Sequence, residues 1–116
     1  MMENEKFNED VQTDNEVRLV MPLVDILDGS DGVTMYFEVP GANAKSVEIE
    51  VRNQVMTITA ASSLRRDGVP IVFKRGFRLS DGADVENISA RTQDGVLTLT
   101  IPKSERARVH RIQVTE

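Results

Sequence analysis

The chain has 116 residues and a net charge of -5, which suits one domain with a hydrophobic core plus tails but not two domains of ordinary size. It contains no cysteine, so disulfide frameworks and thiolate metal sites are excluded, and a reducing, cytoplasmic location is expected. No apolar run approaches the length of a membrane span, and the basic residues form no stripe interleaved with aromatics, so neither a membrane nor nucleic acid is an expected partner.

The first 18 residues read as an arm without a core. They carry one lysine among six acids and show no apolar periodicity; the acids are Glu3, Glu5, Glu9, Asp10, Asp14 and Glu16. Such a segment buries too little apolar surface to offset the entropy of ordering, so we expect residues 1–18 to be disordered.

From Leu19 onwards the chain consists of short runs rich in Val, Ile and Thr, interrupted every eight to twelve residues by turn formers. This pattern predicts an all-β, antiparallel sandwich over residues 19–103. The first two runs, residues 23–27 and 33–39, flank the sequence DGSDG. Its two glycines, Gly29 and Gly32, permit the positive φ that a hairpin needs.

Three later segments alternate apolar and polar residues with period two, which predicts strands with one packed face. They are residues 46–52, 55–60 and 95–102. The first two are joined by a tight hairpin at Arg52-Asn53-Gln54, and Pro102 ends the third because proline cannot donate to a ladder.

Residues 71–79 place four apolar side chains and Arg75 on the same side of a strand. An arginine in that position must be paired if it is buried. Two interpretations remain open: Arg75 lies at an exposed edge and reaches water, or it forms an ion pair with an acid of a second subunit.

The last segment, residues 104–116, is a basic tail that nevertheless contains Ile112 and Val114. A frayed terminus gains nothing from two β-branched residues, so we expect another surface to bury them. Their side chains point the same way in an extended chain, about 6.6 Å apart, and can enter one groove together.

No constellation for catalysis or cofactor binding is found. The only histidine, His110, lies in the tail, so Ser62 and Ser63 have no evident general base. Residues 40–46 lack the glycines of a phosphate-binding loop, and residues 28–31 lack the spacing of an EF-hand. We therefore predict no enzyme activity, no cofactor and no metal.

Four separated motifs, in the right order, resemble the small heat-shock proteins. The strongest is A-x-x-x-n-G-v-L, carried here by Ala90, Gly95, Val96 and Leu97. Upstream, Phe73-x-Arg75-x-Phe77-x-Leu79 resembles the family's F-x-R-x-F-x-L-P, and residues 24–41 resemble its v-D-i to l-P-G stretch. Ile112-x-Val114 matches the C-terminal I-x-I/V motif.

The resemblance implies an immunoglobulin-like α-crystallin domain that dimerises and acts as an ATP-independent holdase for unfolding proteins. It also implies that the tail motif docks in a groove between two strands of a neighbouring subunit. In this sequence the accepting residues would be Val47, Ile49, Val51, Ile88 and Ala90.

The connection at residues 62–72 is too short for the loop strand that bacterial and plant members usually exchange. We therefore expect edge-to-edge dimerisation through an extended strand, with the interface at Val69, Ile71, Val72, Phe73, Arg75 and Phe77. The short, acidic arm favours a homodimer or small homo-oligomer, with co-assembly with another small heat-shock protein left open.

A protein-binding module of the co-chaperone CS type shares this sandwich and is the alternative function. Such modules lack the G-V-L strand followed by an I-x-V tail, so Gly95, Leu97, Ile112 and Val114 favour the holdase.

Overall fold

The computed structural model describes residues 16–107 and 111–116 of the chain. Most of the predicted arm and His110 lie outside these residues. The described strands are β1 (Arg18–Val20), β2 (Val24–Asp28), β3 (Gly32–Glu38), β4 (Val47–Arg52), β5 (Val55–Arg66), β6 (Val69–Arg78), β7 (Ser89–Gln93) and β8 (Val96–Pro102). Two short 3-10 turns, η1 (Val85–Asn87) and η2 (Glu105–Ala107), complete the described elements.

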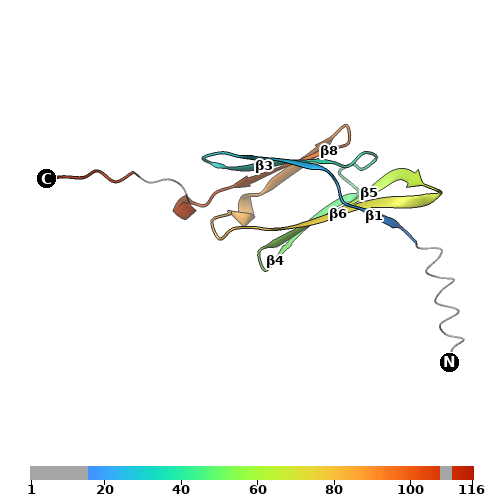
Figure 1. Cartoon of the computed structure of the whole chain (residues 1–116), viewed down its shortest axis with the longest axis horizontal. Helices are drawn as coiled ribbons and strands as arrows, with labels where there is room; N and C mark the ends of the chain where they lie inside the picture. Colours follow the sequence, from blue (N-terminus) through green and yellow to red (C-terminus); the bar gives the residue numbers. More distant parts are fainter. Residues whose placement is uncertain (1–15, 108–110) are drawn as a thin grey trace, which may run out of the picture.

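The strands form two four-stranded sheets packed face to face, which confirms the predicted β-sandwich (Figure 1). One sheet has the order β1-β6-β5-β4 and the other the order β2-β3-β8-β7. All pairings are antiparallel except that of β1 with β6, which is parallel.

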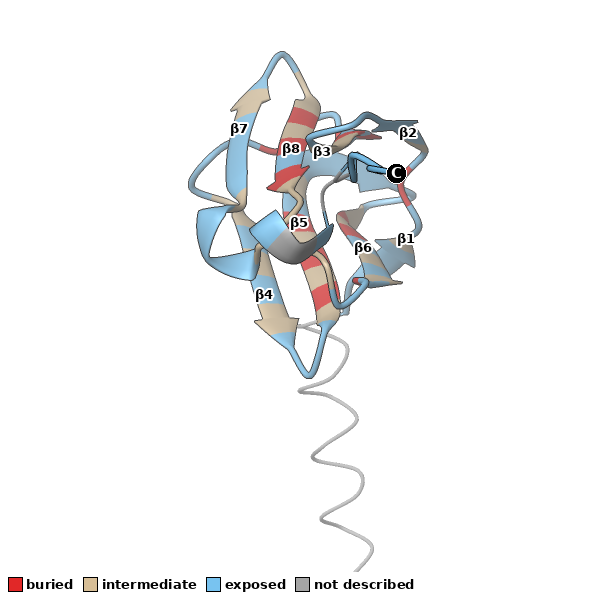
Figure 2. Ribbon diagram, turned by 90° about the vertical axis from the view of Figure 1, so that its left-hand side faces the viewer, coloured by how far each residue is buried: buried red, intermediate tan, exposed pale blue. Residues whose placement is uncertain are grey.

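Period-two alternation positions the core between the sheets, as the sequence predicts. Met56, Ile58 and Ala60 of β5 are buried, while the residues that precede each of them are only half-buried. The residues with buried apolar side chains, whose ribbon is red in Figure 2, are Met35, Phe37, Val39, Ala42, Met56, Ile58, Ala60, Ile71, Phe73, Leu79, Leu97, Leu99 and Ile101. Phe37 and Phe77 meet edge to face across the sandwich, with ring centroids 5.7 Å apart.

Three hairpins turn in two residues, with positive φ at both, as the twist of paired strands requires. These turns are Asn53-Gln54, Asp67-Gly68 and Asp94-Gly95. The predicted hairpin at residues 52–54 is confirmed, and residues 62–72 form a long β5–β6 hairpin rather than a loop.

The two glycines of DGSDG act differently from the prediction. Neither has a positive φ, although β2 and β3 do form the predicted hairpin. Gly32 is needed for another reason: an added Cβ would collide with the carbonyl oxygen of Ile101 on β8. Close strand packing, and not turn conformation, therefore requires this glycine.

Candidate functional site: an apolar groove between two sheet edges

β4 and β7 are edge strands of different sheets, and they lie side by side along one flank of the sandwich (Figure 2). Between them is a cavity of about 130 Å³, lined by Ala44, Val47, Ile49, Ala90, Arg91, Thr92 and Leu97. An apolar cavity of about 150 Å³ accommodates benzene, so this one has room for a branched aliphatic side chain.

The groove exists because two of its lining residues are alanines. Ala44 and Ala90 are both exposed and too small to fill the space above Leu97, which is 1% exposed at the floor. A larger side chain at either position would close the cavity. The side chains of the sandwich therefore leave this groove unfilled.

The structure brings three of the five predicted groove residues to the cavity. Val47 and Ile49 reach it from β4, and Ala90 reaches it from β7. Val51 and Ile88 are half-buried and pack against the core, but neither lines the cavity. Ala44, Arg91, Thr92 and Leu97 complete the lining and were not among the predicted groove residues. Ala44 could not be anticipated, because only the folded turn before β4 brings it close to β7.

Two signature residues, Ala90 and Leu97, line the groove, and a third, Gly95, lies in the turn that joins their strands. The backbone N–H of Val39 donates to the Gly95 carbonyl oxygen at 2.8 Å, which ties the β7–β8 turn to the Pro40-Gly41 loop. Gly95 has φ +78, and an added Cβ would lie 3.2 Å from Pro40 Cα. The motifs at residues 39–41 and 90–97 thus form one contact, although about fifty residues separate them.

The predicted dimer edge is partly covered by the chain itself. β1 pairs with residues 71–73, placing Leu19 opposite Val72 and Val20 opposite Phe73. In the described part of the chain, no strand pairs with residues 74–78 on that side of β6. Ile71 and Phe73 are buried in the core, so their side chains are not available to a partner.

Arg75 has partners within its own chain that the sequence did not indicate. It is half-buried, and its guanidinium donates from Nη1 to the carbonyl oxygen of Pro22 at 3.1 Å. The same group lies over the ring of Phe77, 4.9 Å from its centroid. Arg75 therefore anchors the segment between β1 and β2 onto β6.

The tail motif is fully presented to solvent. Ile112 and Val114 are 86% and 87% exposed, the highest values among the large apolar side chains that the structure describes. Figure 1 shows residues 111–116 extending away from the sandwich. These two side chains are unburied within one copy.

A second apolar surface, on β1, β2 and the segment between them, was missed in the sequence. Leu19, Met21 and Leu23 are 63%, 69% and 70% exposed, and Ile26 and Leu27 of edge strand β2 are also exposed. The signal was present, because residues 19–27 carry apolar side chains at both parities and a two-layer fold buries only one parity.

No three His, Asp or Glu side chains within residues 16–107 and 111–116 are grouped to hold a metal ion. No helix of the described ranges is long and apolar enough to cross a membrane.

The sequence profile of the Hsp20/alpha crystallin family matches residues 25–115. The chain belongs to this family. The resemblance inferred from the four motifs is thereby confirmed, and the sandwich is an α-crystallin domain. Small heat-shock proteins are chaperones and not enzymes.

Relatives of this small heat-shock protein come from bacteria and from a plant. The chain is 37% identical to the 18 kDa antigen 2 of Mycobacterium avium over 82% of this chain and 74% of that protein. It is 33% identical to the 18 kDa heat shock protein of Streptomyces albus G over 72% of this chain and 66% of that protein. Among solved structures, a small heat-shock protein from Xylella fastidiosa is 27% identical with a TM-score of 0.65, covering 84% of this chain and 98% of that one.

Proposed function

We propose that this protein is an ATP-independent holdase that binds unfolding proteins and limits their aggregation. The observation that carries the proposal is an open apolar groove on a stable sandwich, together with Ile112 and Val114 left in solvent. Apolar seams of this kind bind apolar segments of other chains, and no nucleotide chemistry is needed for such binding.

Tail docking supplies the first assembly contact in this proposal, with residues 104–116 as the tail. Burying Ile112 and Val114 in the groove of another copy contributes roughly 3–6 kcal/mol, at about 1.5–3 kcal/mol for each side chain. Ordering half a dozen tail residues costs about 1–2 kcal/mol for each residue. A single tail therefore binds weakly, and several tails acting together hold an assembly reversibly.

Edge pairing of β6 supplies the second contact. Residues 74–78 pair with β5 on one side, but in the described part of the chain no strand pairs with them on the side where β1 lies. This free side is the stretch through which two copies can pair directly. Extending that pairing to residues 71–73, as the predicted interface requires, displaces β1. Because β1 has only three residues, the strand of a second copy can replace it beside β6.

The partners in this proposal are unfolding client proteins and further copies of a small heat-shock protein, as a homodimer, a small homo-oligomer or a mixed assembly. The relative from Xylella fastidiosa forms a distinct high order structure. We place the protein in the cytoplasm, where a chain without cysteine suits the reducing conditions.

The test is heat-induced aggregation of an unrelated enzyme, followed by light scattering without ATP. We expect near-stoichiometric amounts of the protein to suppress scattering. The Ala90→Leu variant, which fills the groove, tests whether suppression of scattering depends on this site. Unchanged scattering in the presence of excess protein contradicts the holdase proposal.

A further inference from the structure

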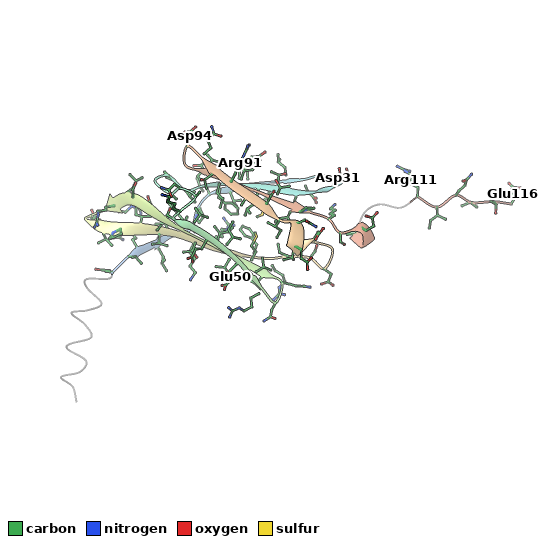
Figure 3. The ribbon with its side chains drawn as sticks, turned by 180° about the vertical axis from the view of Figure 1, so that it is seen from behind. Asp31, Glu50, Arg91, Asp94, Arg111 and Glu116 are labelled. Atoms are coloured by element: carbon green, nitrogen blue, oxygen red, sulfur yellow. The ribbon has the colours of Figure 1, made fainter. Side chains whose placement is uncertain are left out.

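Strand β4 has two chemically different faces next to the groove. Val47 and Ile49 point towards the cavity, while Glu48 and Glu50 point outwards and are exposed. Figure 3 shows Glu50 on the outer side of its sheet. Within residues 16–107 and 111–116, Glu48 makes no ion pair, and the single partner of Glu50 is its exposed neighbour Arg52 at 3.2 Å.

The tail repeats this pattern with the opposite charge. Ile112 and Val114 share one face of an extended segment, and Arg111 and Gln113 share the other. Figure 3 shows Arg111 and Glu116 on the extended tail, far from the sandwich. When Ile112 and Val114 enter the groove, Arg111 must therefore face the same side as Glu48 and Glu50.

The position of the cavity restricts how the tail can pair with β4. Val47 and Ile49 line it and Val51 does not, so the two tail side chains must lie opposite residues 47 and 49. Directly opposite residues of paired strands point to the same side of a sheet. Only two arrangements satisfy this condition, one antiparallel and one parallel.

Charge separates these two arrangements. In the antiparallel one, Ile112 lies opposite Ile49, which places Arg111 opposite Glu50 and brings Glu116 to Lys45 in the turn before β4. In the parallel one, Arg111 lies opposite Ser46, and Glu116, at the other end of the tail, lies opposite Val51. Opposite charges across a strand pair stabilise it, so the antiparallel arrangement is favoured at both ends of the tail.

Strand β7, which forms the other wall of the groove, offers no acidic residue to pair with Arg111. The outward residues of β7 are Ser89, Arg91 and Gln93, which include no acid. Figure 3 shows Arg91 on the sheet that faces away from Glu50. A tail strand on β7 leaves Arg111 without an opposite charge and in some registers places it against Arg91.

We propose that residues 111–116 of a second copy add to the free edge of β4 as an antiparallel strand, in the register that sets Arg111 opposite Glu50. This inference rests on the tail docking of the proposed function. It adds the direction, the register and the residue that selects them. β4 is an edge strand with backbone groups available for a ladder, and the ladder with β5 continues to Ser46, whose carbonyl oxygen accepts from Ala61 N–H at 3.0 Å.

Disulfide trapping in the full-length protein tests the register, because the chain has no cysteine of its own. Opposite residues of antiparallel strands lie about 4.5–5.5 Å apart at Cα, within disulfide range. The pair Thr115→Cys/Ser46→Cys is opposite only in the antiparallel arrangement and leaves Arg111 and Glu50 intact. The matched pair Thr115→Cys/Glu50→Cys is opposite only in the parallel one, and Gln113→Cys/Glu48→Cys is opposite in both.

We expect oxidation to produce covalent dimers and longer cross-linked species from the 115/46 pair and the 113/48 pair, but none from the 115/50 pair. Dimers from 113/48 and 115/50 without 115/46 overturn the antiparallel register while leaving tail docking intact. No cross-link from any pair, or cross-linked monomers only, overturns docking onto a second copy. Aggregation suppression is measured separately, so failure of the register and failure of the holdase function are distinguishable.

Charge reversal tests the role of Arg111 in the same assay. Arg111→Glu or Glu50→Lys should weaken association and lower the yield of the 115/46 dimer about two- to fivefold, the range typical of an exposed ion pair. Combining both reversals should restore the yield. Glu38→Lys, which reverses an exposed acid on the opposite sheet, is the matched control and should have no effect. A double reversal that is no better than either single variant overturns the pairing.

Discussion

Gly41 shows how one residue joins the two motifs that the sequence displays separately. Its φ is +87, and an added Cβ would collide with the Ser62 hydroxyl and approach Leu64 Cγ to 3.0 Å. That hydroxyl donates to the Pro40 carbonyl oxygen at 2.7 Å, and Ser63 N–H donates to the Gly41 carbonyl oxygen at 2.9 Å. The Pro40-Gly41 loop is therefore fixed onto β5, and Gly95 packs against its other side.

We predict that Gly41→Ala lowers the free energy of unfolding by about 1–3 kcal/mol for the left-handed backbone and by about 1–3 kcal/mol more for the disturbed Ser62 hydrogen bond. Gly68→Ala is the matched control, because Gly68 has φ +79 but nothing within 4 Å of an added Cβ. Urea denaturation of both variants isolates the contact. Equal losses in the two variants would show that the contact with Ser62 contributes nothing.

Arg75 marks the limit of what residue patterns reveal. The apolar parity of residues 71–79 correctly predicts that its side chain lies on the packed side of β6. Its acceptor, the Pro22 carbonyl oxygen, is a backbone group 53 residues away and has no signature in the sequence. A side-chain partner could have been guessed from charge, whereas a backbone partner is known only once the chain is folded.

At the scale of strands, alternation and turn chemistry predict most of the fold. Residues 46–52, 55–60 and 95–102 form strands with the expected faces turned inward, because the period-two pattern leaves only one way to pack them. The inner faces of the last two are buried, and that of the first is half-buried. β1 was not predicted to pair with β6. A three-residue strand has no periodicity to detect, and its parallel partner lies about fifty residues further along the chain.

Part of the groove was predictable from the same period-two alternation. Alternation correctly assigns Val47 and Ile49 to the inner face of β4, but the family resemblance was needed to bring them together with Ala90. The absence of bulk at Ala44 and Ala90 creates the cavity. A hydropathy pattern does not show where a small side chain leaves space unfilled, so the cavity could not be predicted from the sequence.

Removing β1 should expose the edge of β6. We predict that a variant lacking residues 1–20 self-associates more strongly than one lacking residues 1–15, because only the first loses the strand that covers residues 71–73. Sedimentation velocity over a range of concentrations measures the difference. Identical sedimentation of the two truncated proteins would mean that β1 does not protect this edge.

At the scale of the whole molecule, the groove and the tail are two complementary ends on one chain. Each copy presents one groove and one tail, and the tail extends away from the sandwich (Figure 1). Contacts of this head-to-tail kind either close into rings or grow into chains, whereas pairing of two β6 edges is symmetric and stops at two. If both proposed contacts form, they generate assemblies larger than a dimer.

We predict that Ile112→Ala/Val114→Ala abolishes species larger than the dimer, because it removes most of the roughly 3–6 kcal/mol that each docked tail contributes. Multi-angle light scattering gives the mass directly. Gln113→Ala/Thr115→Ala, which alters the outward residues of the same tail, is the control and should retain the larger species. An unchanged mass in the apolar variant would remove the tail from assembly.

The position of β8 has a consequence for how each copy is made. β8 lies at the centre of its sheet, between β3 and β7, yet it is the last strand in chain order. At roughly 5–20 residues per second on the ribosome, the nearly sixty residues between β3 and β8 take several seconds to synthesise. Until then β3 lacks the neighbouring strand that pairs with it, and Met35 and Phe37 lack the side chains of Leu97 and Leu99 beside them. A newly made copy therefore passes through an incompletely packed stage, like that of the unfolding chains that chaperones bind.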